Sequence, residues 1–226
     1  MKLLTIDTET AGLAPASGTG VCDLAIACVD EDFGVYWKIE SLIDPECIIS
    51  PGAMGVHHIT QEMVADKPTL GEFMREHKYP FDDADVFIGH NCHFDLRFVR
   101  DYLPDSFQVI DTLKLSRILW PDLDSHELQT LRYTFGLDAG SAHRAMGDVI
   151  TTISLARHIC EEVGTDAQGL LQLMNAPLPL TTRIKFGKHK GERLCDLPMT
   201  YVRWLVDKAD IEPDLREALA ARLYPN

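Results

Sequence analysis

The chain has 226 residues and a mass of 25.3 kDa, which suits one domain with a small appendage or a single larger domain. Hydrophobic residues make up 46% and charged residues 25%, the balance of a globular protein rather than a disordered one. The 35 acidic residues outnumber the 21 lysines and arginines, and the net charge of −14 argues against a long, sequence-blind grip on duplex nucleic acid. The charge does not exclude a protein that contacts a few nucleotides at a strand end and uses metal ions to neutralise their phosphates.

The sequence carries no sign of a membrane or secretory protein. No apolar run approaches roughly 18 residues, so no membrane span is expected. The opening MKLLTIDTET has a short apolar stretch that Asp7 and Glu9 interrupt, unlike the apolar core of a signal peptide. The six cysteines include no CxxC pair, which argues against a zinc knuckle or a thioredoxin-like motif. We therefore expect reduced thiols and a cytoplasmic protein.

Charge divides the chain unequally. Residues 1–175 hold 12 basic and 28 acidic residues, whereas residues 176–226 hold 9 basic and 7 acidic ones. Prolines and glycines near the division loosen the chain and remove backbone donors. We predict a main domain over 1–165, a linker over 166–182, and a small basic hairpin and helix region over 183–226.

The predicted elements begin with three consecutive strands, over 2–6, 23–29 and 35–43, joined by short loops as in an antiparallel meander. Helical and strand patterns then alternate. Helical spacing occurs in 60–66 and 70–77, a strand in 85–90, a helix in 94–103, a strand and helix in 109–120, and helices in 148–163 and 170–174. This order predicts a mixed α/β sheet with helices on its faces.

Asp7 and Glu9 form the first chemical signal. They stand two residues apart at the end of the first predicted strand, so their side chains point to the same face. Two carboxylates in that position repel each other unless a cation lies between them, and Mg²⁺ or Mn²⁺ prefers such oxygen ligands. The alternative is a solvated strand end or the cap of the next turn.

Two further acids stand at predicted helix starts. Asp95 follows a strand and a turn, in the first turn of a helix, where capping alone could explain it. The spacing of the nearby histidines and cysteine matches no structural zinc pattern. Asp148 opens the amphipathic helix over 148–163, and His143 lies in the loop that approaches it. The alternative for His143 is an ordinary surface histidine.

Three motifs, IDTETAGL (6–13), HNCHFD (90–95) and HRAMGD (143–148), occur in this order. Together they resemble the DEDDh 3′→5′ exonucleases, whose fold is an RNase H-like mixed sheet flanked by helices. The resemblance covers essentially residues 1–160. It implies that the four acids of the family are Asp7, Glu9, Asp95 and Asp148 and that its histidine is His143. The loop GLAPASGTG (12–20) looks longer than in many relatives, which leaves the rim of the site there undefined.

The resemblance implies a two-metal hydrolysis of a phosphodiester, with two Mg²⁺ or Mn²⁺ ions in the site. Asp7 would bridge both ions, Glu9 and Asp148 would hold the ion that activates water, and Asp95 would support the second. His143, with an ordinary pKa of about 6.5, would take the proton from that water.

Four residues are candidates for contact with substrate. By resemblance Leu13 packs against the terminal base, and Phe94 is a second candidate for base stacking or sugar packing. Either could be a core residue. The C-terminal stretches FGKHKG and MTYVRWLV resemble the exonuclease X subgroup of the family. Lys188 and Lys190 lie in the chain's basic cluster and are predicted to touch substrate phosphate; the alternative is a solvated hairpin tip.

These features predict a cytoplasmic, metal-dependent 3′→5′ exodeoxyribonuclease that acts at DNA 3′ ends and releases nucleoside 5′-monophosphates. An RNA-trimming enzyme of the same fold is one alternative, because the motifs do not reveal contacts to the 2′ position. A proofreading subunit that binds a polymerase is another, and polymerase or repair proteins would then be partners. A binding module without activity is disfavoured, because all five catalytic positions are filled.

Overall fold

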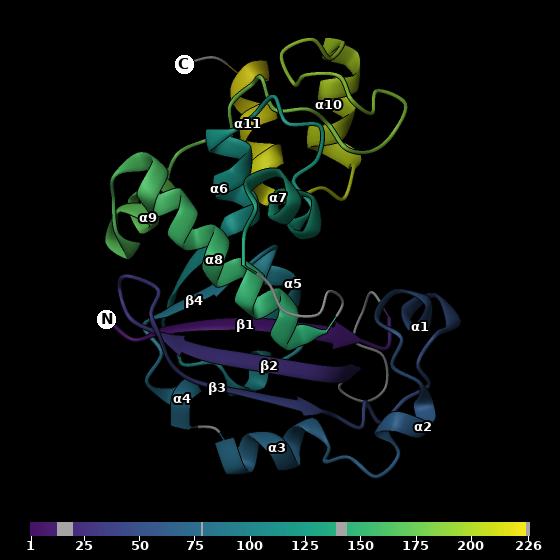
Figure 1. Cartoon of the computed structure of the whole chain (residues 1–226). Coiled ribbons are helices and arrows are strands. Elements are labelled where there is room, and N and C mark those ends of the chain that lie inside the picture. The colour runs from purple at the N-terminus through teal and green to yellow at the C-terminus, as the bar shows by residue number, and fades with distance from the viewer. Residues whose placement is uncertain (13–19, 78, 139–143, 225–226) are drawn as a thin grey trace.

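The computed structural model describes residues 1–12, 20–77, 79–138 and 144–224. Its centre is a five-stranded mixed sheet in the order β3-β2-β1-β4-β5 (Figure 1). β1 pairs antiparallel with β2 and β2 with β3, whereas β4 runs parallel to β1 and to β5. The strands are β1 (Leu3–Thr10), β2 (Val21–Val29), β3 (Val35–Leu42), β4 (Val86–Gly89) and β5 (Gln108–Asp111). The predicted meander and mixed sheet are confirmed.

Helices surround this sheet. They are α1 (Pro51–His57), α2 (Gln61–Val64), α3 (Leu70–His77), α4 (Tyr79–Asp82), α5 (Cys92–Leu96), α6 (Thr112–Leu119), α7 (Leu128–Phe135), α8 (Ala145–Val163), α9 (Ala167–Leu173), α10 (Met199–Lys208) and α11 (Pro213–Leu223). The helix expected over 94–103 is wrong in extent, because α5 ends at Leu96 and a 3-10 turn follows at Arg100–Tyr102. None of the helices in the described ranges is long and apolar enough to cross a membrane.

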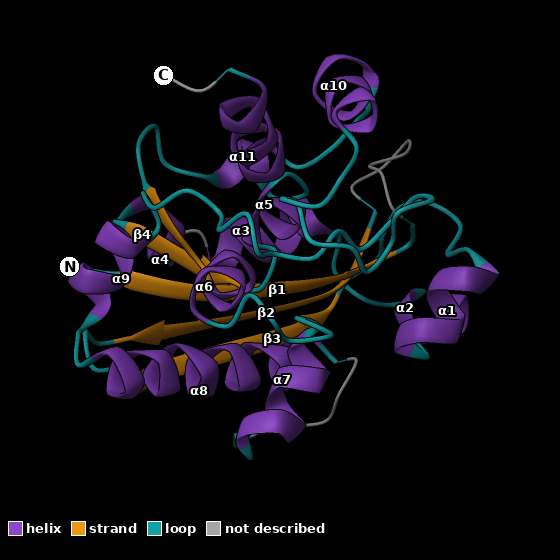
Figure 2. Ribbon diagram, turned by 90° about the horizontal axis from the view of Figure 1, so that it is seen from above, coloured by secondary structure: helices purple, strands orange, loops and turns teal. Residues whose placement is uncertain are grey.

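The two faces of the sheet bury separate apolar clusters. Leu3 of β1 packs with Val149, Ile153 and other residues of α8, whereas Leu4 and Ile6 pack with residues of α3, α4 and α5 on the opposite face. This alternation follows from the period of two along a strand. Figure 2 shows α8 lying along one side of the sheet. Every second residue of β1 therefore faces α8, and those in between face α5.

The C-terminal segment builds a third apolar cluster, around Leu194, Val202, Leu205 and Leu219, against which Ile118 of α6 packs. Ion pairs Lys114–Asp214 and Arg117–Glu212 also join α6 to α11 and to Glu212, the residue that precedes it. The predicted hairpin contains a single antiparallel bridge, between Arg183 and Arg193.

Within the predicted linker 166–182, α9 forms as its apolar pattern indicated, and Ala167, Leu170 and Leu171 join the cluster under α8. Burial of these side chains fixes the first half of that stretch against the main sheet. The division into 1–165, 166–182 and 183–226 stays a prediction.

Candidate active site

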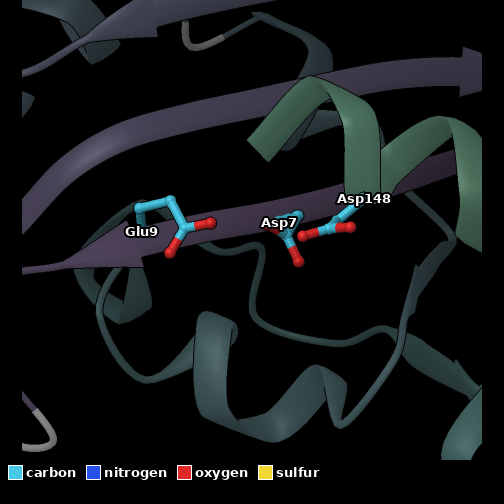
Figure 3. Close-up of side chains that lie close together, drawn as sticks. All are labelled: Asp7, Glu9 and Asp148. Atoms are coloured by element: carbon cyan, nitrogen blue, oxygen red, sulfur yellow. The ribbon is translucent and has the colours of Figure 1, made fainter. Parts of the chain in front are cut away.

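Asp7 and Glu9 lie on the face of β1 that α8 covers, as the strand period predicts. Asp148 projects toward them from the first turn of α8. One carboxylate oxygen from each of the three lies within 4.8 Å of the others (Figure 3). The packing of α8 across the sheet thus brings together Asp7 and Asp148, which are 141 positions apart in the sequence.

The start of α8 is fixed to the sheet by Arg144. Its Nε donates to Asp23 at 2.9 Å and its Nη2 donates to Glu40 at 3.3 Å. Asp23 is fully buried and stands opposite Glu9 in the β1–β2 register. Arg144 therefore neutralises a further acid beside the cluster and holds the turn of helix that carries Asp148.

Gln129 of α7 supports Asp148 directly. Its Nε2 donates to Oδ1 of Asp148 at 2.6 Å, and its own Oε1 accepts from Nη1 of Arg132 at 3.2 Å. The bond from Arg132 therefore orients the amide of Gln129, and the amide in turn orients the carboxylate of Asp148. Sequence reasoning missed Gln129, because a glutamine inside a short amphipathic helix carries no local signal of such a role.

Gln129→Ala is expected to lower the turnover of substrate and the affinity for divalent ions by roughly 10- to 100-fold, as loss of a group that orients a metal ligand usually does. Phosphodiester cleavage and Mn²⁺ binding by calorimetry would measure both. Gln172→Ala on the exposed side of α9 is the matched control and should leave both unchanged. Equal Mn²⁺ affinity in Gln129→Ala and the unaltered protein would contradict the assigned role.

Asp95 approaches the cluster from the other side of β1. Its Oδ1 accepts from the backbone N of Thr8 at 2.9 Å and from Thr8 Oγ1 at 2.7 Å, and only 4% of Asp95 is exposed. β4 pairs with β1 only at Leu3–Thr5, so no strand supplies an acceptor to Thr8 on that side. Asp95 takes the place of the missing strand and is held beside Asp7. The first-turn position predicted for Asp95 is confirmed.

Asp111 at the end of β5 positions α5, which carries Asp95. Its Oδ1 accepts from the backbone N of Asn91 at 3.0 Å and of Leu113 at 2.9 Å, and its Oδ2 accepts from Cys92 N at 3.0 Å. One buried carboxylate therefore caps the starts of α5 and α6 together. Gly89 is required before this turn, because a Cβ there would lie 2.8 Å from the Cβ of Cys92.

The clustered acids disfavour one another's ionised forms. Burial, followed by the charges of Asp95 and Asp148, raises the pKa of Asp7 well above its usual range. Burial and Asp148 raise the pKa of Glu9 to about 8. Burial also raises the pKa of Asp95 to about 7, although its hydrogen bonds from Thr8 act in the opposite direction.

This arrangement fits divalent metal ions. The donor set is made of carboxylate oxygens alone, which hard ions such as Mg²⁺ and Mn²⁺ prefer. A bound cation would also relieve the repulsion that raises these pKa values. Asp7, Glu9 and Asp148 form the group of metal-capable side chains found among the described residues, and Asp95 adjoins it.

The other residues that the sequence predicted for the site do not lie together in the described structure. His143 and Leu13 lie outside the described residues. Phe94 lines a cavity of about 450 Å³ together with Glu9. Lys190 lines a different cavity, whereas Lys188 places its Nζ 5.3 Å from the ring centroid of Tyr201.

The nearby His90 is held within the fold, with Nδ1 2.9 Å from Thr112 Oγ1 and Nε2 2.8 Å from the carbonyl oxygen of His126. Both ring nitrogens of His90 are thereby engaged within the fold.

Comparison with known proteins gives two family matches in succession along the chain. A family described as "Exonuclease" matches residues 4–156, and one described as "Putative quorum-sensing-regulated virulence factor" matches residues 166–221. The chain is 32% identical over 226 residues to Exodeoxyribonuclease 10 of Escherichia coli, covering 96% of each. It is 31% identical over 157 residues to DNA polymerase III subunit epsilon of Treponema pallidum, covering 66% of this chain and 72% of that protein.

A solved structure, "Exonuclease X in complex with 5' overhanging duplex DNA", superimposes with a TM-score of 0.61 and 31% identity. The match covers 76% of this chain and 99% of the solved one. About a quarter of the present chain therefore has no counterpart in that structure.

Proposed function

We propose a DNA-directed activity for this chain, which belongs to the DEDD-type 3′→5′ exonuclease family. The predicted resemblance to this family and to exonuclease X is confirmed, and the chain is a 3′→5′ exonuclease. The observation that carries the choice of DNA is the 32% identity to an exodeoxyribonuclease along 96% of both chains. The proposed products are nucleoside 5′-monophosphates.

Asp7, Glu9, Asp95 and Asp148 are the side chains that would hold two divalent ions, Mg²⁺ or Mn²⁺. When bound, such ions supply positive charge against the scissile phosphate and the oxygens that attack and leave it. The all-carboxylate donor set supports this assignment. Because the ions neutralise the reacting phosphate, the surrounding chain can keep its net charge of −14.

His143 is the proposed general base. Its imidazole nitrogen would take the proton from the attacking water, and an ordinary pKa of about 6.5 suits that exchange near neutral pH. The family motif HRAMGD, which ends at Asp148, supports the assignment.

The cavity beside Glu9 is the proposed site of the terminal nucleotide. Its volume of about 450 Å³ is adequate for one nucleotide, and Thr8, Thr10, Val56 and Phe94 are among its lining residues. Phe94 offers a ring for stacking that accepts any base. Leu13 is proposed to pack against the same base.

A second candidate function is proofreading within a replicative polymerase. The 31% identity to a polymerase III epsilon subunit favours it, and a polymerase would then be a partner. The alternative substrate is RNA, which the chain would trim from the 3′ end. A cytoplasmic location stays a prediction.

The test uses two 5′-labelled strands of one sequence, DNA and RNA, each with Mg²⁺, with EDTA and with the Asp148→Ala variant. We expect a ladder that shortens from the 3′ end of DNA and that disappears with EDTA and in the variant. Faster degradation of RNA would overturn the choice of DNA as substrate, whereas the proposed role of the four acids would stand. If neither strand is cut until a polymerase is added, the proofreading role replaces the independent one.

A further inference from the structure

A cavity of about 690 Å³ lies where the exonuclease core meets the C-terminal segment, and we call it the seam cavity. The core contributes the β4–α5 junction, α6 and the stretch before α7, and the C-terminal segment contributes Lys185 and Lys190. Figure 1 shows α10 and α11 above α6 and α7.

The seam cavity gathers basic side chains of an acidic protein. Arg117, Lys185 and Lys190 line it together with Asp124 and Glu127. Arg117 is held by its ion pair with α11, and Lys185 donates to the backbone carbonyl of Asp124. The Lys190 ammonium has no hydrogen bond or ion pair with any described side chain or carbonyl, so its charge is available to a ligand.

His126 adds a buried polar group in need of a partner. It is 3% exposed and lines the cavity, and its Nδ1 lies 3.1 Å from Ser116 Oγ. Its Nε2 is buried and has no partner among the described residues. Because Ser116 Oγ donates to the carbonyl oxygen of Leu113, it accepts from Nδ1 of His126, and Nε2 is left as an acceptor that an ordered water rather than a phosphate oxygen would satisfy.

Two of the elements that line the seam cavity are connected to the clustered acids. Leu128 and Thr130 of its wall flank Gln129, whose side chain binds Asp148. Asn91, also in the wall, precedes α5 with Asp95. A polynucleotide whose 3′ end is at the acids therefore has an adjacent cavity, with Lys185 and Lys190 in its lining, for the nucleotides that precede the scissile bond.

We propose that the seam cavity binds backbone phosphate of the DNA strand upstream of the terminal nucleotide, with Lys190 as a phosphate contact. The inference rests on the proposed function and extends it to the C-terminal segment. Binding should then depend on strand length, because a dinucleotide is too short to occupy both the terminal site and the seam cavity.

Fluorescence anisotropy with labelled thymidine oligonucleotides tests this in the Asp148→Ala background with Mg²⁺, where the strand is not consumed. Lys190→Ala should weaken binding of a strand of about twelve nucleotides several-fold and reduce the dependence of log K on log salt by about 0.7. Binding of a dinucleotide should not change. Lys208→Ala, an exposed lysine at the end of α10, is the matched control and should behave as the parent.

An unchanged salt dependence for the long strand in Lys190→Ala would overturn the proposal. So would an equal loss in Lys188→Ala, since that lysine lies against Tyr201 and does not line the cavity. This assay measures binding and not cleavage. If the unaltered protein cuts no DNA but Lys190→Ala still weakens binding of the long strand, the proposed activity fails and the proposed role of the seam cavity stands. Tighter binding of an RNA strand of equal length would show that the seam cavity binds RNA and not DNA.

Discussion

Asp7→Asn is expected to abolish exonuclease activity while making the metal-free protein more stable. Burial, followed by the charges of Asp95 and Asp148, raises the pKa of Asp7, so its carboxylate is costly to ionise without metal. Neutral asparagine removes that repulsion and keeps the volume. With metal, the same change deletes a proposed ligand, and we expect the loss to cost several kcal/mol of transition-state stabilisation, or about a thousand-fold in rate.

Two measurements on one preparation check this pair of opposite effects. Cleavage of a 5′-labelled DNA strand gives the rate, and a thermal melt at pH 8 in EDTA gives the stability. Asp105→Asn, in an exposed loop, is the matched control and should alter neither. Asp7→Asn protein that melts earlier than the parent in EDTA would show that Asp7 stabilises the metal-free fold and would contradict the electrostatic argument.

Stability of the metal-free protein is expected to fall as pH rises from 6.5 to 8. The folded-state pKa of Glu9 is about 8 and that of Asp95 about 7, whereas both groups ionise near pH 4 in the unfolded chain. In this window the folded state binds more protons than the unfolded state. Linkage then requires the free energy of unfolding to decrease with rising pH.

Buried histidines act in a lower pH range and with the opposite sign. Burial lowers the pKa of His90 and of His126 to about 4 each, against an ordinary value of 6.5. Their unfolded forms bind protons between pH 4 and 6.5 and their folded forms do not, so stability there rises with pH. Above pH 6.5 the unfolded histidines lose their remaining protons within about one pH unit, so the carboxylates dominate the change up to pH 8.

Melts at pH 6.5 and pH 8, in EDTA and in Mg²⁺, provide the measurement. The gain in melting temperature from Mg²⁺ should be larger at pH 8, because ionised carboxylates bind the ion and neutral ones do not. Glu9→Gln should flatten the pH dependence in EDTA, and Glu62→Gln on the exposed side of α2 should not. A metal-free protein that gains stability from pH 6.5 to pH 8 would rule out raised carboxylate pKa values.

Local sequence patterns determined much of the site. The period of two placed Asp7 and Glu9 on one face, and Asp95 and Asp148 lie in first turns of helices as predicted. Order of motifs along the chain indicated the family and its fold. These properties depend on neighbours within a few residues, so they can be inferred without knowing the rest of the molecule.

Only the tertiary structure decided what meets these acids. Thr8 takes Asp95 as an acceptor because β4 stops short beside β1, and Gln129 reaches Asp148 because α7 packs on α8. Both contacts join residues that are far apart in sequence. A threonine or a glutamine by itself does not indicate that it will bind such a carboxylate.

The two lysines of the C-terminal turn show the same limit. Lys188 and Lys190 are equivalent in the sequence, yet one lies against Tyr201 and the other lines the seam cavity. The sequence by itself determined which acids have the pattern of a metal site, because periodicity and helix starts are local. The supports of those acids, and the direction in which each surface charge faces, were decided by packing between distant segments.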